Sequence, residues 1–325
     1  MRVKKIIIWG HKLDTGHTHS YVHYGFHRAA KFMGYDCYWL DNRDTVDYDF
    51  FDNSLVISEQ WAVFANQISN KLPMHKNAYY VINYVGNKQE VNGNLDGNPG
   101  INLYLNKVKR LIEMRFSCDW GDDKNWEYSF EPKKYIELQE KTSYLEKKTD
   151  YDILYSFWAT DLLPNEFDES YCDREREDRA LFVGTIRSDN EYLFHPFIEA
   201  CKENNVPFMW NNPWNGALSV EQTREEISKS NYTPDFRPGY TATGGYVSCR
   251  TFKNFSYGNW CSTNSQKVYE FYDGQIPFSE NTHEIFYKIK EKINDRKTLK
   301  NMMKMVQSNH TFVNRIDVML KTIKE

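Results

Sequence analysis

The fold is decided by a stretch near the start of the chain that reads KKIIIWG over residues 4–10. An unbroken apolar run that ends in a glycine is typical of a parallel strand buried on both faces. After a polar loop, apolar residues at helical spacing begin near Ser20 and stop at Gly34, which can end a helix. Residues 36–40 predict the next strand. This strand–helix–strand order is the unit from which open parallel sheets are built.

A second alternation of the same kind starts after the charged residues 173–179. A strand, a helix, a strand and a helix are expected over 180–183, 192–204, 206–210 and 220–230. Two alternations in one chain favour an α/β protein with two Rossmann-like lobes and a hinge near 165–179. We expect further strands over 55–58, 79–85 and 152–158, a loop over 86–100, and helices over 61–70, 101–114, 131–149, 282–293, 297–307 and 311–323.

The composition is that of an ordinary globular protein. The 325 residues carry 41 Lys and Arg against 45 Asp and Glu, a net charge of −4, and 40% of them are hydrophobic. These values exclude wholesale disorder, and the lack of a basic excess argues against a nucleic-acid partner.

Membrane and secretory segments are not expected either. The apolar run at the start is far shorter than the ~20 residues that a bilayer needs, and no cleavage site follows it. Six scattered cysteines without a C-x-x-C pair favour reduced thiols and a cytoplasmic location. Plentiful Asn and Lys with little Ala suggest AT-rich coding, and hence a viral or bacterial source.

The loop after the first strand is rich in titratable groups. In open α/β sheets, ligands bind outside the carboxyl ends of the strands. His17, Asp14 and His19 lie in this loop, and a histidine oriented by a carboxylate can serve as general base. A zinc site is the alternative, but the H-E-x-x-H spacing and supporting Cys or acidic ligands are missing. We interpret His23 and His27, at further steps of four, as the flank of a helix.

Basic residues in the second lobe can hold an anion. Arg187 follows a glycine in the loop after the strand at 180–183, and an arginine binds phosphate through two parallel hydrogen bonds. Arg250 and Lys253 lie three residues apart on a helix predicted after a Gly-Gly turn, so both can face one anion.

A polar turn with Asn264 and Ser265 then precedes the next helix. Two helix N-termini with these residues predict a diphosphate site. The alternative is a solvated turn and a surface cation pair. The G-x-G-x-x-G fingerprint is absent, which argues against a nicotinamide or flavin cofactor.

These motifs resemble those of glycosyltransferases with the GT-B architecture. The matching features are R-x-F-x-x-x-x-x-G at 250–258, HTFVNR at 310–315, HSYVHYGF at 19–26 and WATDLLP at 158–164. The similarity spans nearly the whole chain and is most specific between Val247 and Arg315.

The resemblance implies an acceptor-side lobe at 1–170, a nucleotide-sugar lobe at 171–309, and a helix at 310–325 that returns to the first lobe. It implies transfer of a hexosyl or pentosyl group from a nucleotide-diphosphate sugar to a glycan, glycoprotein or other hydroxyl acceptor. The donor would contact Arg187, Arg250, Lys253, Asn264, Ser265 and, at the ribose, Glu270. Protein cations would offset the charge of the departing diphosphate, so neither a metal nor another cofactor is expected.

One departure from the resemblance concerns the stereochemistry. Many retaining enzymes of this architecture carry two glutamates where this chain has Gly245 and Lys253. The missing acidic pair favours inversion. Two other functions stay open: a non-catalytic two-lobed protein that binds a nucleotide or glycan, and a sugar-nucleotide-modifying enzyme, which would need the missing dinucleotide fingerprint.

Overall fold

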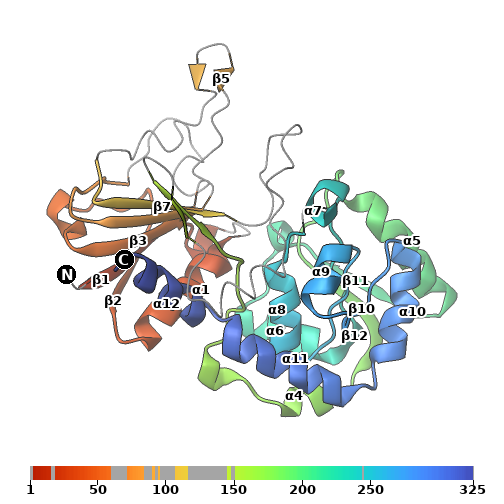
Figure 1. Ribbon diagram of the computed structural model, residues 1–325. Coiled ribbons are helices and arrows are strands. Elements are labelled where there is room, and N and C mark those ends of the chain that lie inside the picture. The colour runs from red at the N-terminus through yellow and green to blue at the C-terminus, as the bar shows by residue number, and fades with distance from the viewer. Residues whose placement is uncertain are drawn as a thin grey trace. The chain divides into compact units, whose positions relative to one another are not determined.

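The computed structural model describes residues 3–15, 19–59, 72–83, 90–91, 94–95, 107–115, 145–147, 151–243 and 245–324. The chain divides into two compact units, which Figure 1 draws with their elements labelled. Unit 1 holds the described residues up to Ser156 together with those from Val313 onward, and unit 2 holds Phe157–Phe312. The chain therefore leaves unit 1 at residues 156–157, earlier than the hinge expected from the sequence.

Unit 1 is built on a sheet in which seven described strands run in the order β2-β1-β3-β4-β7-β9-β8. Neighbouring strands are parallel except β8, which is antiparallel to β9. The strands are β1 Lys5–Trp9, β2 Asp36–Leu40, β3 Ser54–Glu59, β4 Tyr79–Asn83, β7 Arg110–Arg115, β8 Leu145–Lys147 and β9 Asp152–Tyr155, and a separate hairpin joins β5 Glu90–Val91 to β6 Asn94–Leu95.

The apolar run that decides the fold lies near the centre of this sheet. Ile6, Ile7 and Ile8 of β1 are completely buried, because strands lie on both sides and α1 (Ser20–Phe32) contacts β1 and β2. The core on one face of the sheet includes Trp9 and residues of β3, β4 and β7. Two short 3-10 helices, η1 (Leu13–Thr15) and η2 (Tyr48–Phe51), complete this part of the chain.

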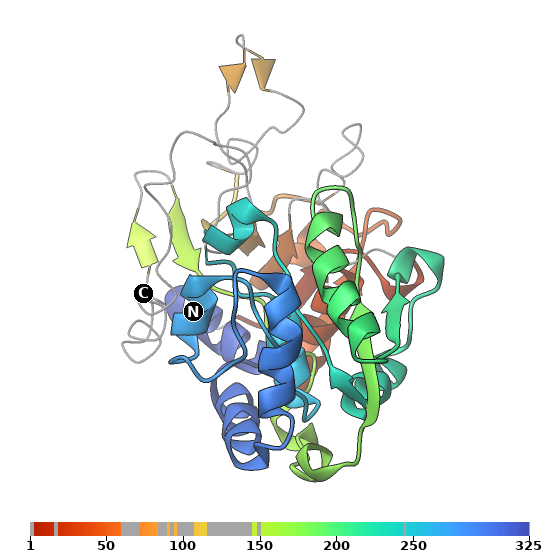
Figure 2. The ribbon, with the colours of Figure 1, turned by 90° about the vertical axis from the view of Figure 1, so that its right-hand side faces the viewer.

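Unit 2 contains a smaller parallel sheet in the order β11-β10-β12. Helices α5 and α10 pack on each other over one face of it (Figures 1 and 2), where Phe182 lies in a core of phenylalanines. Helix α6 contacts the other face through Ile227. The bounds are β10 Glu177–Val183, β11 Phe208–Asn211, β12 Ser230–Tyr232, α5 Glu191–Glu203, α6 Val220–Lys229 and α10 Thr282–Lys292.

The two chain segments that connect the units meet inside unit 2. The backbone N–H of Thr160 donates to His310 O at 3.0 Å, and Thr160 forms a parallel bridge with Thr311. The Thr160 hydroxyl also lies 2.7 Å from that of Ser256 on α8. The remaining elements are η5 Pro164–Glu166, α4 Ser170–Asp173, η6 Pro213–Asn215, α7 Gly239–Thr243, α8 Cys249–Ser256, α9 Gln266–Phe271, α11 Arg296–Asn309 and α12 Phe312–Thr322.

Helix α12 belongs to unit 1 beyond its first residue. Its Ile316 and Met319 are completely buried, and Arg110 Nη1 on β7 donates to Thr322 O at 2.6 Å. None of the helices described here has the length and apolar character needed to span a bilayer.

Two predicted helices are corrected by the structure. Residues 110–115, of which 110–114 were expected to end a helix at 101–114, form β7, because β4 and β9 pair with this segment on its two sides. Residues 145–147, expected within a charged helix at 131–149, form the edge strand β8. The helix expected at 61–70 lies outside the described residues.

Substitution of two glycines of unit 2 can distinguish the cost of a positive φ from the cost of a steric clash. Gly258 and Gly274 have φ of +73° and +71°, a region that costs an L-residue about 1–2 kcal/mol. A Cβ at Gly258 would lie 2.6 Å from the backbone carbonyl carbon of Tyr171, whereas one at Gly274 would meet the end of the Tyr269 side chain, with the hydroxyl oxygen at 3.1 Å and the ring carbon that bears it at 3.2 Å. We expect Gly274→Ala to lower the free energy of unfolding by about 1–2 kcal/mol and Gly258→Ala by clearly more. Denaturant unfolding measures both, and equal losses would contradict the steric argument.

Candidate active site

Four side chains meet at the carboxyl edge of the sheet in unit 1. Glu59 is the last residue of β3, and its side chain is only 1% exposed. His19, at the N-cap of α1, bonds Glu59 Oε2 closely through Nδ1. Nε2 of His11 and Nε2 of His23 lie 3.8 and 3.7 Å from Glu59 Oε1. We call these four residues the His–Glu cluster.

A glycine makes room for this cluster. Gly10 directly follows β1, and a Cβ there would overlap the ring of His23. Nδ1 of His23 lies 3.4 Å from the backbone carbonyl oxygen of His11. Because any other residue at position 10 would overlap the His23 ring, the glycine after β1 is required for this arrangement of the cluster.

Burial and charge compete in the His–Glu cluster. Burial alone would raise the pKa of Glu59, but the charge and hydrogen bond of His19 outweigh it, so that pKa is well below its usual value. Burial likewise opposes protonation of His19, but the Glu59 carboxylate raises the His19 pKa above its usual value. Burial lowers the pKa of His23 to about 4 and also lowers that of His11. His19 is therefore the most basic ring of the three, and its side chain is 29% exposed.

Asp14, also predicted as catalytic, pairs with Arg43 instead of joining the His–Glu cluster. Asp14 is 65% exposed, and both of its oxygens accept hydrogen bonds from Arg43, at 2.9 and 3.0 Å. The Arg43 hydrogen bonds also hold the pKa of Asp14 below its usual value. His17 lies outside the described residues. Sequence reasoning missed Glu59, for which the only signal was an acidic residue at the end of a buried strand.

The zinc alternative gains no support from the described part of the chain. No group of three or more His, Cys, Asp or Glu side chains there is arranged to hold a metal ion. His27, expected on the flank of a helix, lies on α1 with its ring 5.7 Å from that of Trp39.

In unit 2, two arginines share one buried carboxylate beyond the carboxyl end of β12. Arg237 Nη2 lies 2.9 Å from Asp235 Oδ1, and Arg250 Nη1 bonds the same oxygen. Ser248 Oγ donates to Asp235 Oδ2 at 2.7 Å. Burial would raise the pKa of Asp235, but the two guanidinium charges hold it below its usual value. We call Asp235, Arg237 and Arg250 the Arg–Asp cluster, which carries one net positive charge.

A second glycine makes room for the Arg–Asp cluster. Gly184 follows β10 with φ of +150°, and a Cβ there would overlap Nη2 of Arg250. The same guanidinium donates to Val183 O at 3.0 Å and lies 4.2 Å above the ring of Phe182. Backbone, ring and carboxylate therefore fix the orientation of Arg250, which is still 18% exposed.

The expected pairing of Arg250 with Lys253 is wrong. Lys253 Nζ lies 3.7 Å from Oδ2 of Asp161, whose Oδ1 accepts the Tyr257 hydroxyl at 2.6 Å. Helix α8 thus directs its two cations to two different carboxylates. The cation that shares a carboxylate with Arg250 is Arg237, which follows β12 between two prolines. The sequence did not indicate Arg237, because no spacing rule links it to α8.

The polar turn before α9 fixes the backbone of the Arg–Asp cluster through hydrogen bonds to Arg237. Asn264 Oδ1 accepts from the backbone N–H of Arg237, and its Nδ2 donates to the Arg237 carbonyl, each at 2.8 Å. Ser265 Oγ donates to Ala242 O at 2.5 Å. Glu270 accepts from Gln266 on α9 at 2.9 Å.

Arg187 is the most exposed of the predicted donor residues. Its side chain is 57% exposed and lies 3.2 Å from Asp189. Among the described residues, neither Arg187 nor Glu270 forms a hydrogen bond or ion pair with the Arg–Asp cluster.

Comparison with known proteins supplies the fold. No known protein family matches the sequence, and no curated protein does. The chain is similar to a solved alpha-glucosyltransferase in complex with UDP and a 13-mer DNA containing a central A:G mismatch (TM-score 0.52, 11% identity, 98% of this chain and 99% of that chain). A second alpha-glucosyltransferase structure, with UDP and a 13-mer DNA containing an HMU base, gives a TM-score of 0.51 at 10% identity over 97% and 98%.

The chain therefore has the GT-B fold, with two Rossmann-like units and a C-terminal helix that returns to the first. The similarity to a third structure, the glycosyltransferase AviGT4 involved in Avilamycin A biosynthesis, is weaker, with a TM-score of 0.44 at 8% identity over 98% of both chains. Because one fold hosts many activities, function has to be argued from the two clusters.

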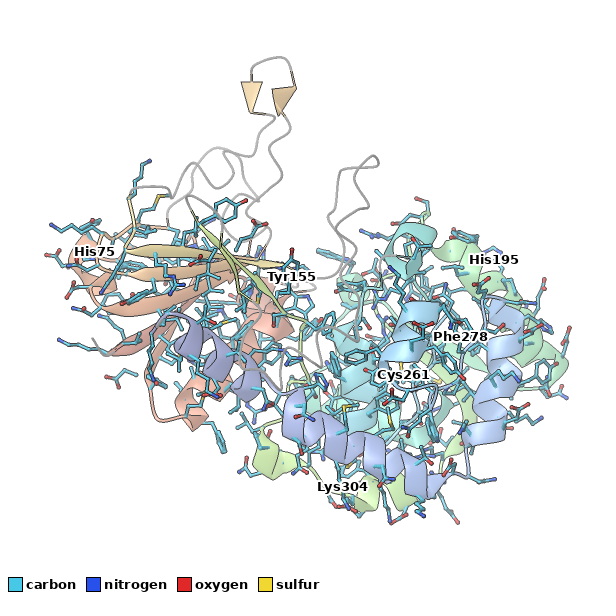
Figure 3. All side chains as sticks on the ribbon, in the orientation of Figure 1. His75, Tyr155, His195, Cys261, Phe278 and Lys304 are labelled. Atoms are coloured by element: carbon cyan, nitrogen blue, oxygen red, sulfur yellow. The ribbon has the colours of Figure 1, made fainter. Side chains whose placement is uncertain are left out.

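The charge balance in the His–Glu cluster can be tested by changing Glu59. Glu59→Gln removes the carboxylate and leaves the burial, so the pKa of His19 should fall from above its usual value to below it. NMR titration of the histidine rings measures this shift. The ring of His195, exposed on α5 of the other unit (Figure 3), should give the same signal in both proteins. An unchanged pKa of His19 would mean that the Glu59 carboxylate does not stabilise the protonated His19 ring.

Proposed function

We propose that this protein is a glycosyltransferase that moves a hexosyl or pentosyl group from a nucleotide-diphosphate sugar to a hydroxyl acceptor. The observation that carries the proposal is the Arg–Asp cluster, a preorganised site of net positive charge beyond the carboxyl end of a parallel strand in a GT-B fold. Ligands of open α/β sheets bind at such edges.

The donor diphosphate binds Arg237 and Arg250 in this proposal. Both guanidinium groups are held before any ligand arrives, because they share Asp235, and Asn264 fixes the backbone of Arg237. Fixed donors stabilise charge that develops on a leaving group without reorganisation at the moment of reaction. Two arginines thus supply what a divalent metal would supply, and we propose a metal-independent transfer without another cofactor.

The acceptor hydroxyl is activated by His19. As the hydroxyl oxygen attacks the anomeric carbon, its proton passes to His19, and the bond from that carbon to the phosphate oxygen breaks with its electron pair leaving on the nucleoside diphosphate. Glu59 orients the ring and stabilises its charged form. Lys253 stands where retaining enzymes carry a glutamate and faces Asp161, which favours a single inverting displacement.

The acceptor is a glycan, a glycoprotein or another hydroxyl compound in this proposal. The two similar structures hold DNA, but a net charge of −4 gives this chain no basic excess for a polyanion. The competing function is a two-lobed protein that binds a nucleotide or glycan without turnover.

A panel of nucleotide sugars tests the proposal against this competitor. Release of free nucleoside diphosphate, slow with water and faster with a suitable acceptor, supports transfer. Binding of a nucleotide sugar without release supports the binding protein, and the absence of both contradicts the proposal. The anomeric configuration of the product decides between inversion and retention.

The base is tested with two histidines of α1. His19→Ala should lower kcat about 10²–10⁴-fold and leave donor affinity unchanged, whereas His27→Ala on the same helix should have little effect. Because only the unprotonated ring accepts a proton, kcat should fall as pH drops through the raised pKa of His19. Glu59→Gln should move that fall to lower pH. Near-normal turnover of His19→Ala would remove His19 from the mechanism.

Substitutions of three basic residues test the anion site. A charge-assisted hydrogen bond contributes about 1.5–3 kcal/mol, so Arg237→Met and Arg250→Met should each weaken nucleoside diphosphate binding by roughly ten- to a hundred-fold. The nucleoside alone should bind all proteins equally. Lys253→Met should cost stability rather than affinity, because it removes a positive charge that lies 3.7 Å from the buried carboxylate of Asp161. Calorimetry measures the affinities, and a strict need for Mg²⁺ or Mn²⁺ would contradict the metal-free mechanism.

A further inference from the structure

Two tryptophans are exposed near the end of the edge strand of the small sheet. Trp210 in β11 is 46% exposed, and Trp214 in η6 is 57% exposed. Large aromatic rings are ordinarily buried for most of their area, so two such rings four residues apart on one edge need an explanation.

The ring of Trp210 is held in place rather than free to turn. Its Nε1 donates to Gly184 O at 2.8 Å, and its backbone is paired with Phe182 in β10. Trp214 is ordered by its backbone N–H, which donates to Asn212 Oδ1 at 3.1 Å. A ring fixed before binding loses little conformational entropy when a ligand covers it.

Gly184 joins this aromatic edge to the Arg–Asp cluster. Its carbonyl accepts the hydrogen bond of Trp210, and the space that its missing Cβ would fill is taken by Arg250 Nη2. The indole of Trp210 and the guanidinium of Arg250 therefore flank one residue. We expect a nucleotide whose diphosphate is held by Arg250 to place its base at this indole, because both side chains contact Gly184.

We propose that Trp210, with Trp214 beside it, is the stacking surface for the base of the donor nucleotide. This inference rests on the proposed function and names the base subsite of the same site. The occupant is a base rather than an apolar peptide, because Trp210 contacts the same residue, Gly184, as a cationic group that matches the phosphates of the same ligand. Every base has a flat face, so the surface supplies affinity while leaving the choice of base to polar neighbours.

The test compares nucleoside diphosphates with inorganic pyrophosphate by calorimetry on the full chain. UDP, GDP, ADP and CDP are first screened, and the best binder is used thereafter. Trp210→Ala should weaken binding of that nucleotide by roughly 5- to 100-fold. It should leave pyrophosphate affinity unchanged, since pyrophosphate has no base. Trp210→Phe, which keeps a ring, should lose less.

Two further variants serve as controls. Arg250→Met should weaken both probes, and Tyr287→Ala, which removes an exposed ring on α10 of the same unit, should weaken neither. Equal losses of nucleotide and pyrophosphate in Trp210→Ala would overturn the inference, because Trp210 would then only support the loop at Gly184. Unchanged nucleotide affinity would overturn it as well. If the parent protein bound neither probe, the proposed function itself would fail.

Discussion

Both candidate sites depend on the same constraint, a position without a side chain directly after the first strand of each unit. Gly10 follows β1 and leaves space for the ring of His23, and Gly184 follows β10 and leaves space for the guanidinium of Arg250. A methyl group at either position would overlap the functional side chain. The two units share no sequence repeat, so the common device follows from the geometry of parallel strands, whose carboxyl ends are where ligands are bound.

Buried carboxylates then fix the basic groups around these glycines. Glu59, Asp161 and Asp235 are almost completely buried, and each faces at least one basic side chain: His19, Lys253, or the pair Arg237 and Arg250. Removing one partner of a buried pair leaves an uncompensated charge, which costs far more than the pair contributes to stability. The basic side chains are consequently held in fixed positions, and substitution of either partner of a pair is poorly tolerated.

Local patterns allowed the architecture to be predicted from the sequence, but not the partners within the sites. The apolar run at 4–10 and the helical spacing after Ser20 predict β1 and α1 correctly, because burial and periodicity are written into neighbouring residues. Residues 110–115 failed this test, since pairing with β4 and β9 overrides their local preference. Glu59 could not be assigned, because the histidines it contacts lie at least 36 positions earlier in the chain. Arg237 could not be linked to Arg250, 13 positions later, because only the fold brings both to the shared Asp235.

The division of the chain has a consequence for how the protein is made. The described part of unit 2 runs from Phe157 to Phe312, with residues of unit 1 before and after it in the chain, and a bridge between Thr160 and Thr311 joins its two ends. Unit 1 therefore cannot be completed until α12, with its buried Ile316 and Met319, has been synthesised after unit 2. At about 5–20 residues per second, translation of unit 2 keeps unit 1 incomplete for roughly 8–30 s. Unit 2 can fold during that interval, so it can be complete before unit 1, although unit 1 comes first in the sequence.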